Sequence, residues 1–141
     1  MSSAGKSPIR GKRRGYNAER RLVKLLSRKR GNYVFRVPVS GSRASPSSST
    51  AFPDVFLVNN VEDRIVAFEV KSTSRNKVKV KRDQILKLFK FLSAFKKYAR
   101  REAVIAVWFS GECRWVFRKV RDPLCCEDIT ITADEESDWQ P

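Results

Sequence analysis

The chain has 141 residues, enough for one domain, and 41% of them are hydrophobic, which is enough to build a core. It carries 30 Lys and Arg against 15 Asp and Glu, so its net charge is +15, and it contains no histidine. The missing imidazole excludes mechanisms that need a histidine base, and three cysteines without histidine cannot complete a four-ligand Cys/His zinc site.

The predicted elements mix two helices with several short strands. Residues 1–15 are expected to form a flexible basic arm, 16–132 a single domain, and 133–141 an acidic, disordered tail. Residues 40–52 hold seven Ser or Thr and no core pattern, which predicts a mobile loop. Helices are expected at 18–30 and 81–98, and strands at 33–39, 54–59, 64–72, 77–80, 103–109, 114–119 and 129–132.

The positive charge is concentrated before residue 122. Residues 1–121 hold all 30 basic residues and 8 acidic ones, whereas residues 122–141 hold 7 acidic residues and no basic ones. A surface this basic favours a polyanionic partner, usually nucleic acid; a solvated face or an anionic membrane surface is the alternative. No segment is long enough to span a bilayer, and neither a signal peptide nor a secreted-type cysteine framework is evident, so we expect a cytoplasmic protein.

Two of the predicted strands bring three charged residues together. If 54–59 and 64–72 form an antiparallel hairpin with a four-residue loop, Asp54 faces Glu69, with Cβ atoms roughly 5 Å apart. Lys71 lies on the same face, about 6.6–6.8 Å further along the strand. The two carboxylates repel unless Lys71 pairs with them on an exposed face or a divalent cation binds, and oxygen ligands suit Mg²⁺ or Mn²⁺ rather than zinc.

Glu19 lies on the apolar face of the first predicted helix, together with Leu22, Val23 and Leu26. A glutamate in a first helical turn can simply be favoured by the helix dipole. With an acidic cluster expected nearby, Glu19 becomes a candidate member of that cluster.

These motifs resemble the P-D…(D/E)-x-K pattern of restriction-endonuclease-like nucleases, here Pro53-Asp54, fourteen residues, then Glu69-Val70-Lys71. The similarity extends to archaeal Holliday junction resolvases over about residues 14–132. It includes the segments NAER (17–20), RVPVS (36–40), FPDV (52–55) and EVKST (69–73), and the stretches 76–95 and 103–117. The resemblance implies an α/β fold with a central mixed five-stranded sheet flanked by helices. It also implies a homodimer that cuts four-way DNA junctions symmetrically and leaves ligatable nicks.

The resemblance also implies residue roles. Glu19, Asp54, Glu69 and Lys71 match the catalytic set, and Ser40 matches a loop serine near it. Mg²⁺, for which Mn²⁺ can substitute, would be held by Asp54, Glu69 and the Val70 carbonyl, with Glu19 acting near it. Phe91 and Phe95 match dimer-interface positions; no membrane partner and no small-molecule cofactor is expected. The residues expected to contact DNA are Arg20, Arg36, Arg43, Lys77, Lys79, Lys81 and Arg82.

Two other interpretations stay open. One is a related metal-dependent nuclease that acts on another DNA form, such as a repair intermediate. The other is a non-catalytic architectural DNA-binding protein, which the basic charge fits equally well. The expected acidic cluster argues against the architectural protein, because carboxylates facing DNA weaken phosphate binding unless a metal is bound.

Overall fold

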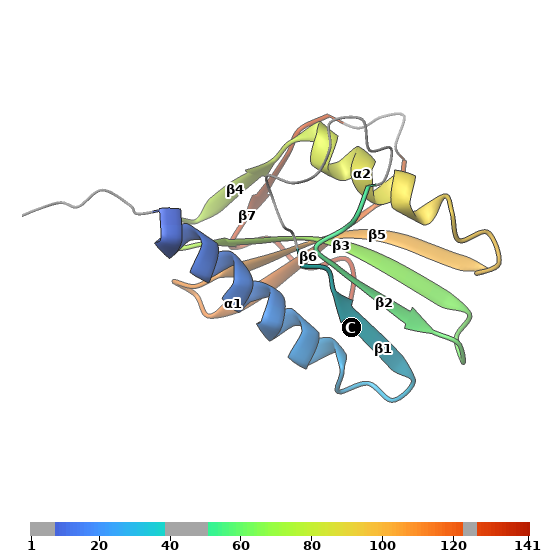
Figure 1. The fold of residues 1–141 in the computed structure, drawn as a ribbon. Coiled ribbons are helices and arrows are strands. Elements are labelled where there is room, and N and C mark those ends of the chain that lie inside the picture. The colour runs from blue at the N-terminus through green and yellow to red at the C-terminus, as the bar shows by residue number, and fades with distance from the viewer. Residues whose placement is uncertain (1–7, 39–50, 123–126) are drawn as a thin grey trace, which may run out of the picture.

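A mixed five-stranded sheet forms the centre of the structure, a computed structural model that describes residues 8–38, 51–122 and 127–141 (Figure 1). Within it, β3 and β5 are parallel and the other neighbouring pairs are antiparallel, which confirms the expected fold class. In spatial order the strands are β1 (Asn32–Arg36), β2 (Val55–Asn59), β3 (Arg64–Thr73), β5 (Arg100–Phe109) and β6 (Arg114–Val120).

The β2–β3 hairpin has the predicted register. Asn59 pairs with Arg64 and Val55 with Phe68. One residue before β2, the N–H of Asp54 donates to the carbonyl of Phe68 at 3.1 Å, so the Asp54 backbone lies beside Phe68, the residue that already pairs with Val55. The predicted pairing of Asp54 with Glu69 therefore does not continue in the backbone; instead the Asp54 carboxylate reaches β3 by accepting the N–H of Val70 at 2.9 Å.

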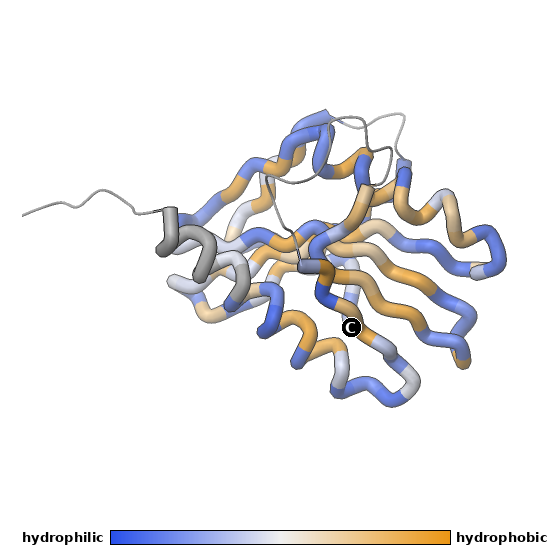
Figure 2. The backbone as a smooth tube through the Cα atoms, in the orientation of Figure 1, coloured by the Kyte–Doolittle hydropathy of each residue, from blue (hydrophilic) through white to orange (hydrophobic). Residues whose placement is uncertain are grey.

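One helix covers each face of the sheet (Figure 1). Helix α1 (Pro8–Leu26) buries its apolar side against a core that includes Val66 and Phe68 of β3. Helix α2 (Arg82–Leu92) packs on the opposite face, where the core includes Ile65 and Ala67. Because both faces are covered, β3 is buried from Arg64 to Val70, and apolar residues run along the strands in Figure 2.

Two short strands form a second sheet. β4 (Lys77–Val80) and β7 (Ile129–Thr132) pair antiparallel, with Val78 opposite Ile131. Both strands have the bounds that the sequence predicts. Val80 and Ile131 are fully buried and join the core on the α2 side of the central sheet.

The helix ends differ from the prediction. α1 begins at Pro8, so the expected flexible arm is wrong for residues 8–15; proline is well suited to the first turn of a helix. α1 ends at Leu26, whose carbonyl accepts the side-chain N–H of Asn32 at 2.9 Å. α2 ends at Leu92 rather than near 98, because the hydroxyl of Ser93 donates to the Lys90 carbonyl at 2.7 Å and replaces a helical partner.

The C-terminal residues 133–141 are ordered against the sheet, so the expectation of a disordered acidic tail is wrong. Trp139 is 5% exposed, and its ring lies 5.3 Å from Phe68 and 5.2 Å from Phe117. Glu135 forms an ion pair with Arg118. The C-terminal segment therefore packs on the rest of the domain through the buried ring of Trp139 and through the ion pair of Glu135.

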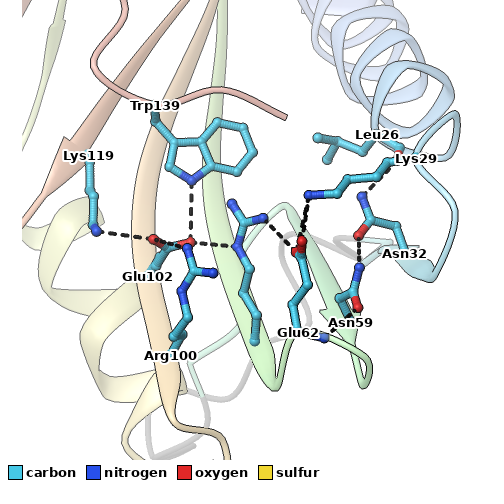
Figure 3. A network of polar contacts seen from close by, with 10 residues as sticks. Leu26, Lys29, Asn32, Asn59, Glu62, Arg100, Glu102, Lys119 and Trp139 are labelled. Atoms are coloured by element: carbon cyan, nitrogen blue, oxygen red, sulfur yellow. Dashed lines mark hydrogen bonds and ion pairs between the residues drawn. The ribbon is translucent and has the colours of Figure 1, made fainter.

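A buried carboxylate at the far end of the sheet connects the tail to the strands (Figure 3). Glu102 accepts hydrogen bonds from Arg64 at 2.7 Å, Lys119 at 3.0 Å and the Trp139 indole at 3.4 Å. Burial acts to raise the pKa of Glu102, but these donors outweigh it and bring the pKa down to about 2. This network has a structural role, because it satisfies a buried charge away from Asp54 and Glu69.

Candidate active site

Asp54 and Glu69 lie close enough for the charge of Asp54 to act on Glu69, although the regular hairpin pairing ends at Val55 and Phe68. Asp54 is half-buried at the entrance to β2, and its Oδ2 accepts the backbone N–H of Val70 at 2.9 Å. Its own carbonyl accepts the N–H of Val37 at 3.0 Å, which ties it to the end of β1. The aspartate is therefore held on both sides by backbone hydrogen bonds.

Of the two carboxylates, Glu69 has the environment that is less favourable for its ionised form. Its side chain is buried, and its Oε2 lies 3.4 Å from the Lys71 ammonium. Burial raises the pKa of Glu69 to about 7, and the nearby charge of Asp54 adds to the increase. Burial also raises the pKa of Asp54, against the hydrogen bond from Val70. Two carboxylates thus lie close together in a largely buried site, where their negative charges repel each other.

Glu69 also holds an unsatisfied oxygen. Among the residues that the structure describes, Glu69 Oε1 is the one buried side-chain oxygen or nitrogen atom with no hydrogen-bond partner. A buried carboxylate oxygen without a donor is costly unless a cation binds it. Oxygen-only donors suit a hard divalent cation, so Asp54 and Glu69 fit such an ion.

Glu19 approaches from the α1 side. It shares the helix face of the fully buried Leu22 and Leu26, as predicted, and its Oε1 lies 3.4 Å from Nη1 of Arg36. Burial raises the pKa of Glu19, and the charge of Asp54 adds to this effect. Within the described ranges, no three acidic or cysteine side chains are gathered as a ready-made metal site. Glu19 is therefore electrostatically linked to Asp54, but not in one tight triad with the pair.

Lys87 of α2 lies near the two carboxylates, and no sequence motif predicts this position. Its charge favours the ionised form of both Asp54 and Glu69, opposing the effect of burial on their pKa values. It belongs to α2, which carries two lysines, Lys87 and Lys90. The available signal was its spacing of four residues from Phe91 on one helix face.

The expected DNA-contacting residues lie on several elements. Arg20 is exposed on α1 beside Glu19, whereas Arg36 is paired with Glu19. Lys77 and Lys79 are exposed on β4, which follows Lys71 after a short turn, and line a surface pocket with Arg75. Lys79 also pairs with Asp128 at 3.5 Å. Two exposed residues continue this basic segment, Lys81 and Arg82, while Ser40 and Arg43 lie outside the described residues.

The two expected interface aromatics differ in exposure. Phe91 is only 9% exposed and lies 5.1 Å from the ring of Phe56, so most of it belongs to the chain's own core. Phe95 is half-buried and packs at 4.9 Å on Phe91. The aromatic row continues past Phe56 to Phe35, which is 47% exposed.

Comparison with known proteins shows one consistent similarity. Residues 10–138 match the family model described as archaeal Holliday junction resolvase (hjc). The chain is 41% identical over 120 residues to the crossover junction endodeoxyribonuclease Hje of Saccharolobus islandicus, covering 85% of this chain and 79% of that protein. The Hje of Sulfolobus acidocaldarius is 38% identical over 120 residues, covering 85% of this chain and 77% of that protein.

A solved structure supports the fold. The structure of Archaeoglobus fulgidus Hjc, a Holliday junction resolvase, matches with a TM-score of 0.59 at 22% identity, covering 84% of this chain and 83% of that one. In the part of the chain that is described, no helix has the length and apolar character needed to cross a membrane.

Proposed function

The chain belongs to the archaeal Holliday junction resolvase family, and from this premise we propose that Asp54, Glu69, Lys71 and Glu19 form its active site. The protein is a crossover junction endodeoxyribonuclease. The observation that carries the site assignment is the Asp54–Glu69 pair, with Lys71 beside it and one buried Glu69 oxygen that has no donor among the described residues.

The cofactor in this proposal is Mg²⁺, for which Mn²⁺ can substitute. Nucleases of this family are generally dependent on a divalent metal. Asp54, Glu69 and the Val70 carbonyl would hold the ion, and Glu19 would act on it through water. When bound, such an ion lowers the pKa of a water molecule and neutralises charge at the reacting phosphate.

The protein's own residues supply the remaining chemistry. Lys71, with its ammonium beside Glu69, orients the attacking water and stabilises the charge that develops on the phosphate. Water loses a proton to a basic group as it adds to phosphorus, the P–O bond to the leaving sugar oxygen breaks, and that oxygen takes up a proton to become a hydroxyl. Ser40, which lies outside the described residues, would act near this centre.

The junction itself would be held by phosphate contacts. Positive side chains bind the backbone without reading sequence, which suits an enzyme that recognises a DNA shape. In the sequence, exposed basic residues of α1 precede the carboxylate pair and those of β4 follow it. The proposed contacts are Arg20, Arg36, Arg43, Lys77, Lys79, Lys81 and Arg82.

The active form in this proposal is a homodimer. A four-way junction has two symmetric cleavage points, and a two-fold dimer presents one site to each. Phe95 packs on Phe91 at the end of α2, and the aromatic row reaches the exposed Phe35. These rings supply the apolar surface that an interface needs. The products would be ligatable nicked duplexes made during recombination and repair, at the nucleoid in the cytoplasm.

Glu69→Gln and Lys71→Met test this assignment directly. Both variants are expected to lose cleavage of a labelled four-way junction in Mg²⁺ while still binding the junction in a mobility-shift assay. Glu69→Gln should bind as well as or better than wild type, since it removes a negative charge facing the phosphates. Cleavage at the wild-type rate by Glu69→Gln would show that the proposed metal site is wrong.

A further inference from the structure

Lys87 lies over the carboxylate pair because of how α2 packs on the hairpin. α2 connects the parallel strands β3 and β5, so it runs antiparallel to them and in the same direction as β2 (Figure 1). The contact between the rings of Phe91 and Phe56, at 5.1 Å, sets which turn of the helix lies over which strand residue.

From the contact between Phe91 and Phe56, steps of similar length along α2 and along β2 lead to Lys87 and to Asp54. Lys87 is one helical turn before Phe91, a rise of about 6 Å, and Asp54 is two residues before Phe56, about 6.6–6.8 Å along the strand. Both steps run toward the same end of the sheet. The Lys87 turn of α2 therefore lies over Asp54, and over Glu69 on the adjacent strand.

Burial and charge support this position. Lys87 is half-buried, whereas Lys90, one turn further along α2, is exposed. The charge of Lys87 acts on both Asp54 and Glu69, and the charge of Lys71 acts on the same two groups. Two ammonium groups, one from β3 and one from α2, thus face one carboxylate pair.

Two lysines in this arrangement are counterions that a divalent cation would replace. The phosphate to be cut must lie against such a cation, and so it also lies beside any ammonium group next to the pair. We propose that Lys87 is a further active-site residue, which neutralises Asp54 and Glu69 in the metal-free protein and contacts the phosphate of the cut strand in the loaded enzyme. This inference rests on the proposed function of the carboxylate pair.

The test compares Lys87→Gln with Lys90→Gln, which removes the same charge from an exposed position of the same helix. Binding of Ca²⁺ to the DNA-free protein is measured by calorimetry, and single-turnover cleavage of a four-way junction is measured in Mg²⁺. Lys87→Gln is expected to bind Ca²⁺ roughly threefold more tightly, because a repelling charge is gone. The same variant is expected to cleave about 10- to 100-fold more slowly, because a phosphate contact is lost.

The proposal predicts that Lys87→Gln binds Ca²⁺ more tightly but cleaves more slowly, and these opposite changes distinguish it from a loss of packing. Damage to the fold would weaken both properties, and that result would overturn the proposal, as would wild-type cleavage by Lys87→Gln or equal slowing by Lys90→Gln. Lys87→Arg, which keeps the charge, should recover most of the cleavage rate. Asp54→Asn is the reference for the site itself: if it still cleaves, the proposed function fails, whereas its inactivity beside a fully active Lys87→Gln overturns this inference alone.

Discussion

Asp54 and Glu69 lie close together where the β2–β3 pairing ends, and their carboxylates differ in hydrogen bonding. Asp54 Oδ2 accepts the N–H of Val70 at 2.9 Å, whereas Glu69 Oε1 has no donor among the described residues. The hairpin thus fixes one carboxylate and leaves the other with an oxygen available to a cation. The unsatisfied oxygen makes Glu69 costly to the stability of the buried strand, a cost that is typical of residues kept for function.

Glu69→Gln is expected to stabilise the metal-free protein while abolishing cleavage. The pKa of Glu69 rises from 4.5 to about 7 in the fold, so its contribution to stability is present below pH 4.5 and is lost as the pH rises through 7. The neutral amide removes this penalty, a gain of roughly 1 kcal/mol or more at pH 8. Urea unfolding with a chelator present, at pH 8 and pH 4, measures it. An equal loss of stability at both pH values would contradict the electrostatic account.

Trp139→Ala is expected to destabilise the protein by about 3 kcal/mol, because it removes a ring buried against Phe68 and Phe117 and a donor to Glu102. Gln140→Ala changes an exposed neighbour and should leave stability within about 0.5 kcal/mol of wild type. Thermal or urea unfolding compares the two variants. A Trp139→Ala protein as stable as wild type would show that the tail does not pack in solution.

Arg20→Gln is expected to weaken junction binding similarly for all sequences and to reduce the salt dependence of binding, with the log–log slope falling by about 1. Arg101→Gln is the matched control, since Arg101 is exposed near the start of β5 at the far end of the sheet and should not change the slope. Binding isotherms at several salt concentrations measure both. Identical slopes for Arg20→Gln and wild type would remove Arg20 from the DNA surface.

Phe95→Glu is expected to give a monomer in sedimentation experiments, because a charge cannot be buried in an apolar interface without a partner. Phe95 is a better test position than Phe91, which is 9% exposed and supports the chain's own core. Lys96→Glu places the same charge at the next, exposed residue and should remain a dimer. A dimeric Phe95→Glu protein would contradict the proposed interface.

The carboxylate pair could be predicted from sequence because the hairpin is local. A four-residue loop sets the pairing from Asn59 with Arg64 to Val55 with Phe68, and the structure has that register, although the pairing ends one residue before Asp54 and Glu69. The strands 77–80 and 129–132 were predicted correctly for similar reasons, since short β-branched runs between polar residues are clear signals.

Lys87 and Trp139 could not be predicted in the same way. The position of Lys87 depends on which turn of α2 lies over Phe56, and that is decided by packing between elements distant in sequence. Trp139 stands alone in an acidic segment, so composition favours disorder, while the hydrophobic gap that it fills is formed by β3 and β6. Tertiary packing decides both cases, and a local signal such as the four-residue spacing of Lys87 from Phe91 is not sufficient to predict it.

The most direct test of the central claim is cleavage of a four-way junction and of a linear duplex of the same arm sequence, by wild type and Asp54→Asn, with and without Mg²⁺. The account predicts that wild type cuts the junction, needs Mg²⁺ to do so, and leaves the duplex intact at equal salt, while Asp54→Asn binds the junction without cutting it. Equal cutting of duplex and junction would contradict junction selectivity. Cutting by Asp54→Asn at the wild-type rate would contradict the active site built on Asp54 and Glu69.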